Sequence, residues 1–245
     1  MENGNNRTSW GKLSFAEIIG RIIKFFGGWL LAGLLSAIAA LMFFGWLADE
    51  VFEGGTKNFD DAVRNYIHQF AAPPVTETMK IFSLIGSPLF LTVLGIAVII
   101  GFLIVKWKRA VVLFLITMAG ELVLDVTLKT FFKRARPEPF FNYALPTSFS
   151  FPSGHALGSF CFFGILAWLV AARLENKFLK FTVWAAAIFL IFAVGLSRIY
   201  LGVHFPSDVA AGYTTGLFWI ATVASGDFWL KRRTEKALAA DASIQ

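Results

Sequence analysis

The chain has 245 residues, 57% of them hydrophobic and 16% charged, and its mean hydropathy of +0.66 excludes an ordinary soluble domain. Two long stretches, 25–48 and 81–105, carry no charge, and each exceeds the roughly 20 apolar residues that cross a bilayer. The net charge of +6 comes from basic residues that cluster at the ends of apolar stretches, so we exclude nucleic-acid binding. Cys161, the sole cysteine, excludes an intrachain disulfide.

Six transmembrane helices are predicted, all in one domain that comprises residues 1–245. The spans are expected at 25–48, 81–105, 110–128, 156–172, 181–196 and 208–230. Gly86-Ser87-Pro88 predicts a kink in the second span. The expected fold class is therefore all-α: a polytopic membrane protein with six helices in one bundle and short interfacial helices.

The segments outside the spans are shorter and more polar. Residues 1–24 are expected to form a cytoplasmic amphipathic lead-in to the first span, with a helix that begins at a capping box, Ser14-Phe15-Ala16-Glu17. A solvated segment before the first span is the alternative. Within 49–80, apolar residues at helical spacing predict a second surface helix that ends at Pro73-Pro74. These residues are Phe59, Val63, Tyr66, Ile67 and Phe70. Residues 231–245 predict a disordered cytoplasmic tail.

The distribution of Lys and Arg predicts the topology. With six spans, 14 of the 22 basic residues fall on the side of the two termini, so the positive-inside rule places both termini in the cytoplasm. A basic cluster on the outer side breaks this rule. Its members are Lys129, Lys133, Arg134 and Arg136. A basic cluster in a disfavoured place indicates an anionic ligand.

Three polar stretches are expected on this outer side, at 129–137, 151–155 and 197–208. In the third stretch, His204 and Asp208 are four residues apart, so one helical turn places them within hydrogen-bond reach. A carboxylate on one imidazole nitrogen fixes the tautomer and leaves the other nitrogen free to attack. A structural ion pair at a helix end is the alternative interpretation.

The remaining polar residues fit the binding of a phosphoryl group. Lys129, Arg136 and Arg198 can together neutralise a phosphate and the charge that develops during its transfer. Ser153 and Gly154 precede the fourth span, where backbone N–H groups favour an anion.

A second imidazole completes the set, because His155 can protonate the leaving oxygen while His204 attacks phosphorus. The sequence contains no evident carboxylate cage, so neither a metal nor another cofactor is expected.

These stretches resemble the three signature motifs of the type 2 phosphatidic acid phosphatase superfamily. The matching patterns are Lys129-x6-Arg136-Pro137, Pro152-Ser153-Gly154-His155 and Ser197-Arg198-x5-His204-x3-Asp208. The membrane branch of this family includes bacterial phosphatidylglycerophosphate and undecaprenyl-diphosphate phosphatases. The resemblance implies His204 as nucleophile, Asp208 as its orienting partner and His155 as general acid. It implies phosphate binding by Lys129, Arg136, Ser153, Gly154 and Arg198.

The expected function is removal of a terminal phosphate from a lipid through a phosphohistidine, at the outer surface of the cytoplasmic membrane. Undecaprenyl diphosphate, phosphatidylglycerophosphate and phosphatidate are the candidate substrates. Lys133 and Arg134 favour a diphosphate if they contact a second phosphate, and a role as interfacial anchors is the alternative. The alternatives are a lipid phosphotransferase, a lipid A phosphatase and a lipid-phosphate transporter. A transporter would use Glu121 and Asp125 as midplane charges. We expect these two acids instead to hold Arg136 or Arg198 in place, with a proton path as the alternative.

Overall fold

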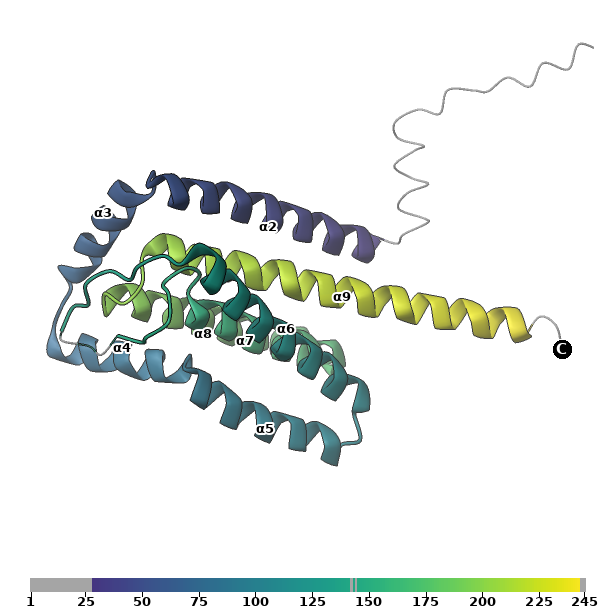
Figure 1. Cartoon of the computed structure of the whole chain (residues 1–245). Helices are drawn as coiled ribbons and strands as arrows, with labels where there is room; N and C mark the ends of the chain where they lie inside the picture. The colour runs from purple at the N-terminus through teal and green to yellow at the C-terminus, as the bar shows by residue number, and fades with distance from the viewer. Residues whose placement is uncertain (1–27, 142, 144, 243–245) are drawn as a thin grey trace, which may run out of the picture.

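The computed structural model describes residues 28–141, 143 and 145–242, and the lead-in helix predicted for 1–24 lies outside them (Figure 1). The described residues form eight α-helices and no strand, which confirms the all-α fold. The helices are α2 Gly28–Glu53, α3 Lys57–His68, α4 Pro73–Ile85, α5 Pro88–Ile104, α6 Lys108–Phe132, α7 Gly154–Arg173, α8 Lys177–Tyr200 and α9 Pro206–Ala242.

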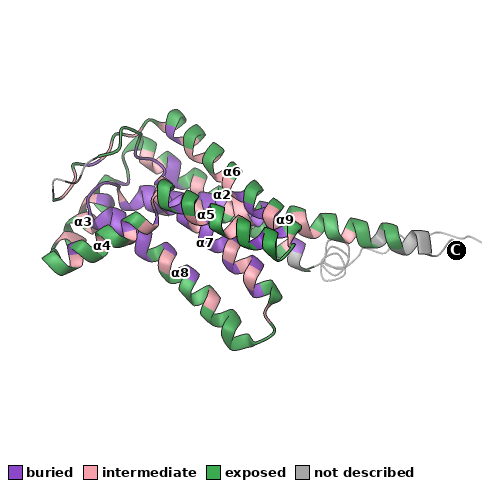
Figure 2. Ribbon diagram, turned by 90° about the horizontal axis from the view of Figure 1, so that it is seen from below, coloured by how far each residue is buried: buried purple, intermediate pink, exposed green. Residues whose placement is uncertain are grey.

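Helix α7 forms the centre of the bundle. It packs against α6, α8 and α9, and twelve of its twenty residues are buried (Figure 2). The aromatic ring of Phe162 packs edge-on against Phe114 of α6, which joins these helices in the largest apolar core. Helix α2 lies along α9 at the edge of the bundle (Figure 1).

Four helices are long and apolar enough to cross a membrane: α2, α6, α7 and α8. Helices α4 and α5 together make a fifth candidate span, bent by 53°. The bend confirms the predicted kink, and Gly86 lets α4 approach α8, because a Cβ at this position would collide with Val194. Helix α9, expected as the sixth span, does not meet the same length and hydropathy criteria. Among the described residues, up to five helices or bent helix pairs can therefore cross a membrane, one fewer than predicted.

The outer faces of these helices carry large exposed apolar side chains, such as Leu89, Ile104, Val123 and Phe189. Exposed apolar surface on this scale is unfavourable in water and indicates contact with lipid.

Two expectations for helix boundaries are wrong. Residues 231–242 are not disordered but continue α9, because Lys, Arg, Glu, Leu and Ala favour a helix and neither Gly nor Pro interrupts them. Pro73 and Pro74 begin α4, since proline fits the first helical turn; the surface helix α3 already ends at His68.

The surface helix α3 is confirmed, but its buried face differs from the predicted apolar face. Phe59 and Tyr66 are 60% and 61% exposed, whereas the neighbouring residue Asp60 is completely buried. A carboxylate is thus the most deeply buried side chain of this helix.

The three motif-bearing segments lie at one end of the bundle, which we call the loop end. Helix α2 starts and helix α9 finishes at the other end (Figure 1). The polar segments therefore meet on one side, as the order of the spans predicts.

Candidate active site

Backbone hydrogen bonds hold the three polar segments together at the loop end. The amide of Ser153, at the start of α7, donates to the carbonyl of Asp208 at 2.9 Å. The amide of Ser150 donates to the carbonyl of Arg134 at 2.9 Å, which links the loop before α7 to the segment after α6. The structure therefore brings together residues that lie up to 79 positions apart in the motifs (129 to 208).

His204 lies between Arg136 and Asp208 and is 1% exposed. Its Nε2 is 2.9 Å from Nη1 of Arg136, and its Nδ1 is 3.4 Å from Oδ2 of Asp208. Because a guanidinium can only donate, we assign Nε2 as the acceptor and place the ring proton on Nδ1, toward Asp208. This tautomer leaves Nε2 without a proton, as a nucleophile requires, and its lone pair accepts the hydrogen bond from Arg136.

Burial lowers the pKa of His204 from 6.5 to about 4, although the hydrogen bond and charge of Asp208 oppose this shift. The nearby guanidinium groups of Arg136 and Arg198 lower the pKa further. The imidazole is therefore neutral at physiological pH.

Both carboxylate oxygens of Asp208 accept hydrogen bonds. Oδ2 accepts hydrogen bonds from the Phe205 amide at 2.9 Å and the Ser150 hydroxyl at 2.5 Å, beside His204. Oδ1 accepts from Nη1 of Arg134 at 2.6 Å. Sequence reasoning missed Ser150, because a serine in a Pro-rich and aromatic loop carries no signal of its own.

Arg136 is fixed by backbone carbonyls. Its guanidinium donates to the carbonyls of Ser148 at 2.8 Å, Val203 at 3.0 Å and Phe149 at 3.2 Å. Burial lowers the pKa of Arg136 from its ordinary value, while the charge of Asp208 raises it. The fork is thus held against His204, in a position from which it can donate to an anion.

Lys129 and Gly154 lie side by side, although they belong to different motifs. The Lys129 ammonium forms an ion pair with Asp125, one turn earlier on α6. A Cβ at position 154 would lie 2.7 Å from Lys129 Nζ and 2.8 Å from Asp125 Oδ1, so glycine lets these two side-chain ends approach the start of α7 without being displaced. Ser153 accepts a hydrogen bond from the Ala156 amide and caps α7.

Arg198 lies deeper than expected and is 2% exposed. One terminal nitrogen donates to the Ser83 hydroxyl, and its guanidinium carbon is 5.8 Å from the Tyr143 ring centroid. Its Nε has no hydrogen-bond partner among the described residues, which leaves a donor available for a ligand.

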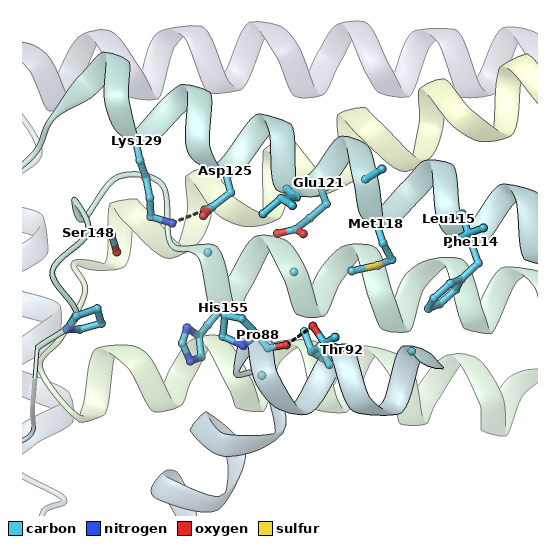
Figure 3. Close-up of a pocket in the computed structure, with 18 of the residues that line it drawn as sticks. Pro88, Thr92, Phe114, Leu115, Met118, Glu121, Asp125, Lys129, Ser148 and His155 are labelled. Carbon is cyan, nitrogen blue, oxygen red and sulfur yellow. Dashed lines mark hydrogen bonds and ion pairs between the residues drawn. The ribbon is translucent and has the colours of Figure 1, made fainter. Parts of the chain in front are cut away.

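A cavity of about 580 Å³ opens between α5, α6 and α7 (Figure 3). Its polar end is lined by five of the eight predicted site residues: Lys129, Arg136, Gly154, His155 and His204. Ser153, Arg198 and Asp208 are buried and are not among the residues that line it. The opposite end is apolar and includes Leu91, Ile96, Ile99, Phe114 and Met118.

Glu121 and Asp125 point into the cavity between its polar and apolar ends (Figure 3). Asp125 forms its ion pair with Lys129, and its charge reaches Arg136 only at longer range, so no ion pair joins it to Arg136 or Arg198 among the described residues. Neither Lys133 nor Arg134 lines the cavity: Lys133 is exposed, and Arg134 pairs with Asp208. The structure therefore removes the argument that favoured a diphosphate.

Comparison with known proteins identifies the family. Residues 110–232 match the model of the PAP2 superfamily, and this range contains all three motifs. The chain belongs to the PAP2 superfamily. It is 28% identical over 201 residues to phosphatidylglycerophosphatase B of Bacillus subtilis, covering 81% of this chain and 98% of the relative.

This PAP2 protein also resembles a solved structure. The crystal structure of a transmembrane PAP2-type phosphatidylglycerolphosphate phosphatase from Bacillus subtilis superposes with a TM-score of 0.75 at 28% identity, covering 80% of this chain and 98% of that one. An undecaprenyl-diphosphatase of Sulfolobus acidocaldarius is 33% identical over 163 residues, covering 64% of this chain and 63% of the relative. The PAP2 protein is thus a multi-pass membrane protein of the lipid phosphatase branch.

Proposed function

We propose that the protein hydrolyses the terminal phosphate of phosphatidylglycerophosphate. The observation that carries this proposal is the cavity, which joins His204 and His155 at one end to apolar side chains of α5 and α6 at the other. A lipid can place its phosphate at the polar end while its acyl chain lies along the apolar end. A water-soluble substrate would not need the apolar half.

The first chemical step transfers the phosphoryl group to His204. Nε2 forms a bond to phosphorus, the bond from phosphorus to the ester oxygen breaks, and His155 donates a proton to that oxygen. Arg136 releases Nε2 and donates to the phosphoryl oxygens instead, together with Lys129 and Arg198.

The second step returns the enzyme to its starting state. His155 takes a proton from water, the water oxygen bonds to phosphorus, and the bond from phosphorus to His204 breaks to release inorganic phosphate. Asp208 stabilises the positive charge that the phosphorylated ring carries.

We infer that neither step uses a metal ion. Three cationic side chains already supply the positive charge, and no three His, Cys, Asp or Glu side chains gather into a metal site within the part of the chain that the structure describes.

The carboxylates of the cavity favour a glycerol headgroup over a diphosphate. Glu121 lies beside Asp125, and no described side chain donates a hydrogen bond to it, so it can accept one from a substrate hydroxyl. In phosphatidylglycerophosphate a hydroxyl-bearing glycerol follows the terminal phosphate. In undecaprenyl diphosphate a second, negatively charged phosphate takes this place, next to the two carboxylates. The similarity to an undecaprenyl-diphosphatase keeps that lipid as the second candidate.

We also infer that the loop end faces outward across the cytoplasmic membrane, with both termini inside. The described basic residues at the opposite end include Lys106, Lys108, Arg173, Lys177 and Lys231, in agreement with the positive-inside rule.

The test is phosphate release by the detergent-purified protein in EDTA, measured on phosphatidylglycerophosphate, undecaprenyl diphosphate, phosphatidate and lipid A. We expect phosphatidylglycerophosphate to turn over fastest, with a loss of about 10³-fold or more in His204→Ala. His68→Gln, a change in a histidine outside the cavity, is the matched control. Equal activity of His204→Ala and the wild type would overturn the mechanism, and faster release from undecaprenyl diphosphate would move the substrate to the second candidate.

A further inference from the structure

Asp60 is a charge buried in an unexpected place. It lies on the surface helix α3, well outside the residues that match the PAP2 model, yet its side chain is completely buried. Burying a carboxylate is costly unless hydrogen bonds and an opposite charge compensate. The surroundings of Asp60 therefore show what this charge contacts.

The partners of Asp60 all belong to the catalytic segments. Oδ1 accepts from the Ser207 amide at 2.9 Å, and Oδ2 accepts from the Ser207 hydroxyl at 2.6 Å. Oδ2 also accepts from Nη2 of Arg134 at 2.9 Å. Ser207 immediately precedes Asp208, so α3 is hydrogen-bonded to the residue next to the carboxylate that contacts His204.

Arg134 connects Asp60 to Asp208. Its Nη2 donates to Asp60, while its Nη1 donates to Oδ1 of Asp208 at 2.6 Å and to the Ser207 hydroxyl at 2.7 Å. The guanidinium carbon lies 4.2 Å from the centroid of the Phe205 ring, which fixes the plane of the fork. One planar cation thus bridges two fully buried carboxylates.

This arrangement gives each oxygen of Asp208 a separate role. Oδ1 faces Arg134, and Oδ2 faces His204, Ser150 and the Phe205 amide. With Arg134 fixed by Asp60, the carboxylate cannot rotate without losing a charge-assisted hydrogen bond. Its orientation determines the tautomer and direction of the His204 ring.

We propose that Asp60 and Arg134 are a buried positioning pair that aligns Asp208 and thereby His204, so that surface helix α3 takes part in catalysis. This inference rests on the proposed function, because it assigns His204 as the nucleophile. Neither residue lines the cavity, so the pair acts on the rate of the chemical step and not on lipid binding.

The test measures kcat and KM for Asp60→Asn and Arg134→Lys. Asn keeps the size of Asp60 but removes the charge that fixes Arg134, and Lys keeps the charge of Arg134 but cannot bridge two carboxylates. We expect kcat to fall about ten- to a hundredfold in each variant with KM nearly unchanged. Asp61→Asn, which removes the same charge one residue away from the network, is the matched control and should keep the wild-type kcat.

A second set of variants separates positioning from a general structural role. If the pair acts through Asp208, Asp60→Asn should lower kcat by less than about threefold when it is added to Asp208→Asn. A structural role would instead lower kcat by the same factor in both backgrounds. Should Asp60→Asn fail to fold, the same comparison with Arg134→Lys decides the question.

The outcomes distinguish this inference from the proposed function. Loss of activity in His204→Ala together with wild-type kcat in both Asp60→Asn and Arg134→Lys overturns the positioning pair alone. Full activity in His204→Ala overturns the proposed mechanism, and the pair with it.

Discussion

Replacing Asp208 with Asn tests how the carboxylate supports His204. Oδ2 of Asp208 faces three donors: the His204 ring, the Ser150 hydroxyl and the Phe205 amide. On the other side, the charged partner of Oδ1 is Arg134. An amide has one oxygen, and three donors outnumber one, so we expect this oxygen to stay at the Oδ2 position with the NH₂ group facing Arg134.

The expected loss follows from this orientation. The His204 tautomer is preserved, so nucleophilic attack remains possible, but the positively charged phosphohistidine loses the negative charge of Asp208. A hydrogen bond to a charged group contributes about 1.5–3 kcal/mol. At about 1.4 kcal/mol per factor of ten, kcat should fall about 10- to 150-fold.

The assay is phosphate release at saturating lipid, combined with thermal unfolding in detergent. In Asp208→Asn the NH₂ group of the amide faces the Arg134 guanidinium, and both groups can only donate. The unfolding temperature of this variant should therefore fall as well. Asp227→Asn is the matched control, because it weakens the ion pair with Arg109 outside the active site. A kcat within twofold of the wild type in a folded Asp208→Asn protein would refute the reasoning, and a loss above 10⁴-fold would mean that the amide has turned and reversed the tautomer.

Three further predictions concern lipid binding, pH and topology. Met118→Trp narrows the apolar end of the cavity, so kcat/KM should fall about tenfold or more for a long-chain lipid while turnover of a short soluble phosphate ester is kept; an equal loss on both would contradict the lipid path. Because burial lowers the pKa of His204 to about 4, its imidazole stays neutral well below pH 6.5, so kcat/KM corrected for substrate ionisation should not decline between pH 7 and pH 5 and should fall only nearer pH 4; a decline centred on pH 6.5 would show that burial does not lower the pKa of this imidazole. Cys161 is buried, so in intact cells a membrane-impermeant maleimide should label Glu138→Cys at the loop end and not Lys180→Cys at the opposite end, and the reverse labelling would invert the proposed topology.

The sequence alone was sufficient for the features that depend on spacing along the chain. The four-residue interval between His204 and Asp208 predicts their contact, which is observed at 3.4 Å, although His204 lies in the loop before α9 and not on a helical turn. The kink at Gly86-Ser87-Pro88 follows from the geometry of proline. The motifs also indicated the PAP2 family, which the match to residues 110–232 confirms.

Only the tertiary structure decided which distant charges meet. Arg134 lies close to the predicted phosphate ligands in sequence, yet it pairs with Asp60 and Asp208, each 74 residues away. Its side chain does not line the cavity. Asp60 is likewise a polar residue on a surface helix until packing buries it against Ser207, 147 residues later. Helical periodicity determines the face on which a side chain lies, but the partner of that face depends on how the helices pack. A buried charge then has a low free energy only where an opposite charge and donors surround it, and that condition is set by the fold as a whole.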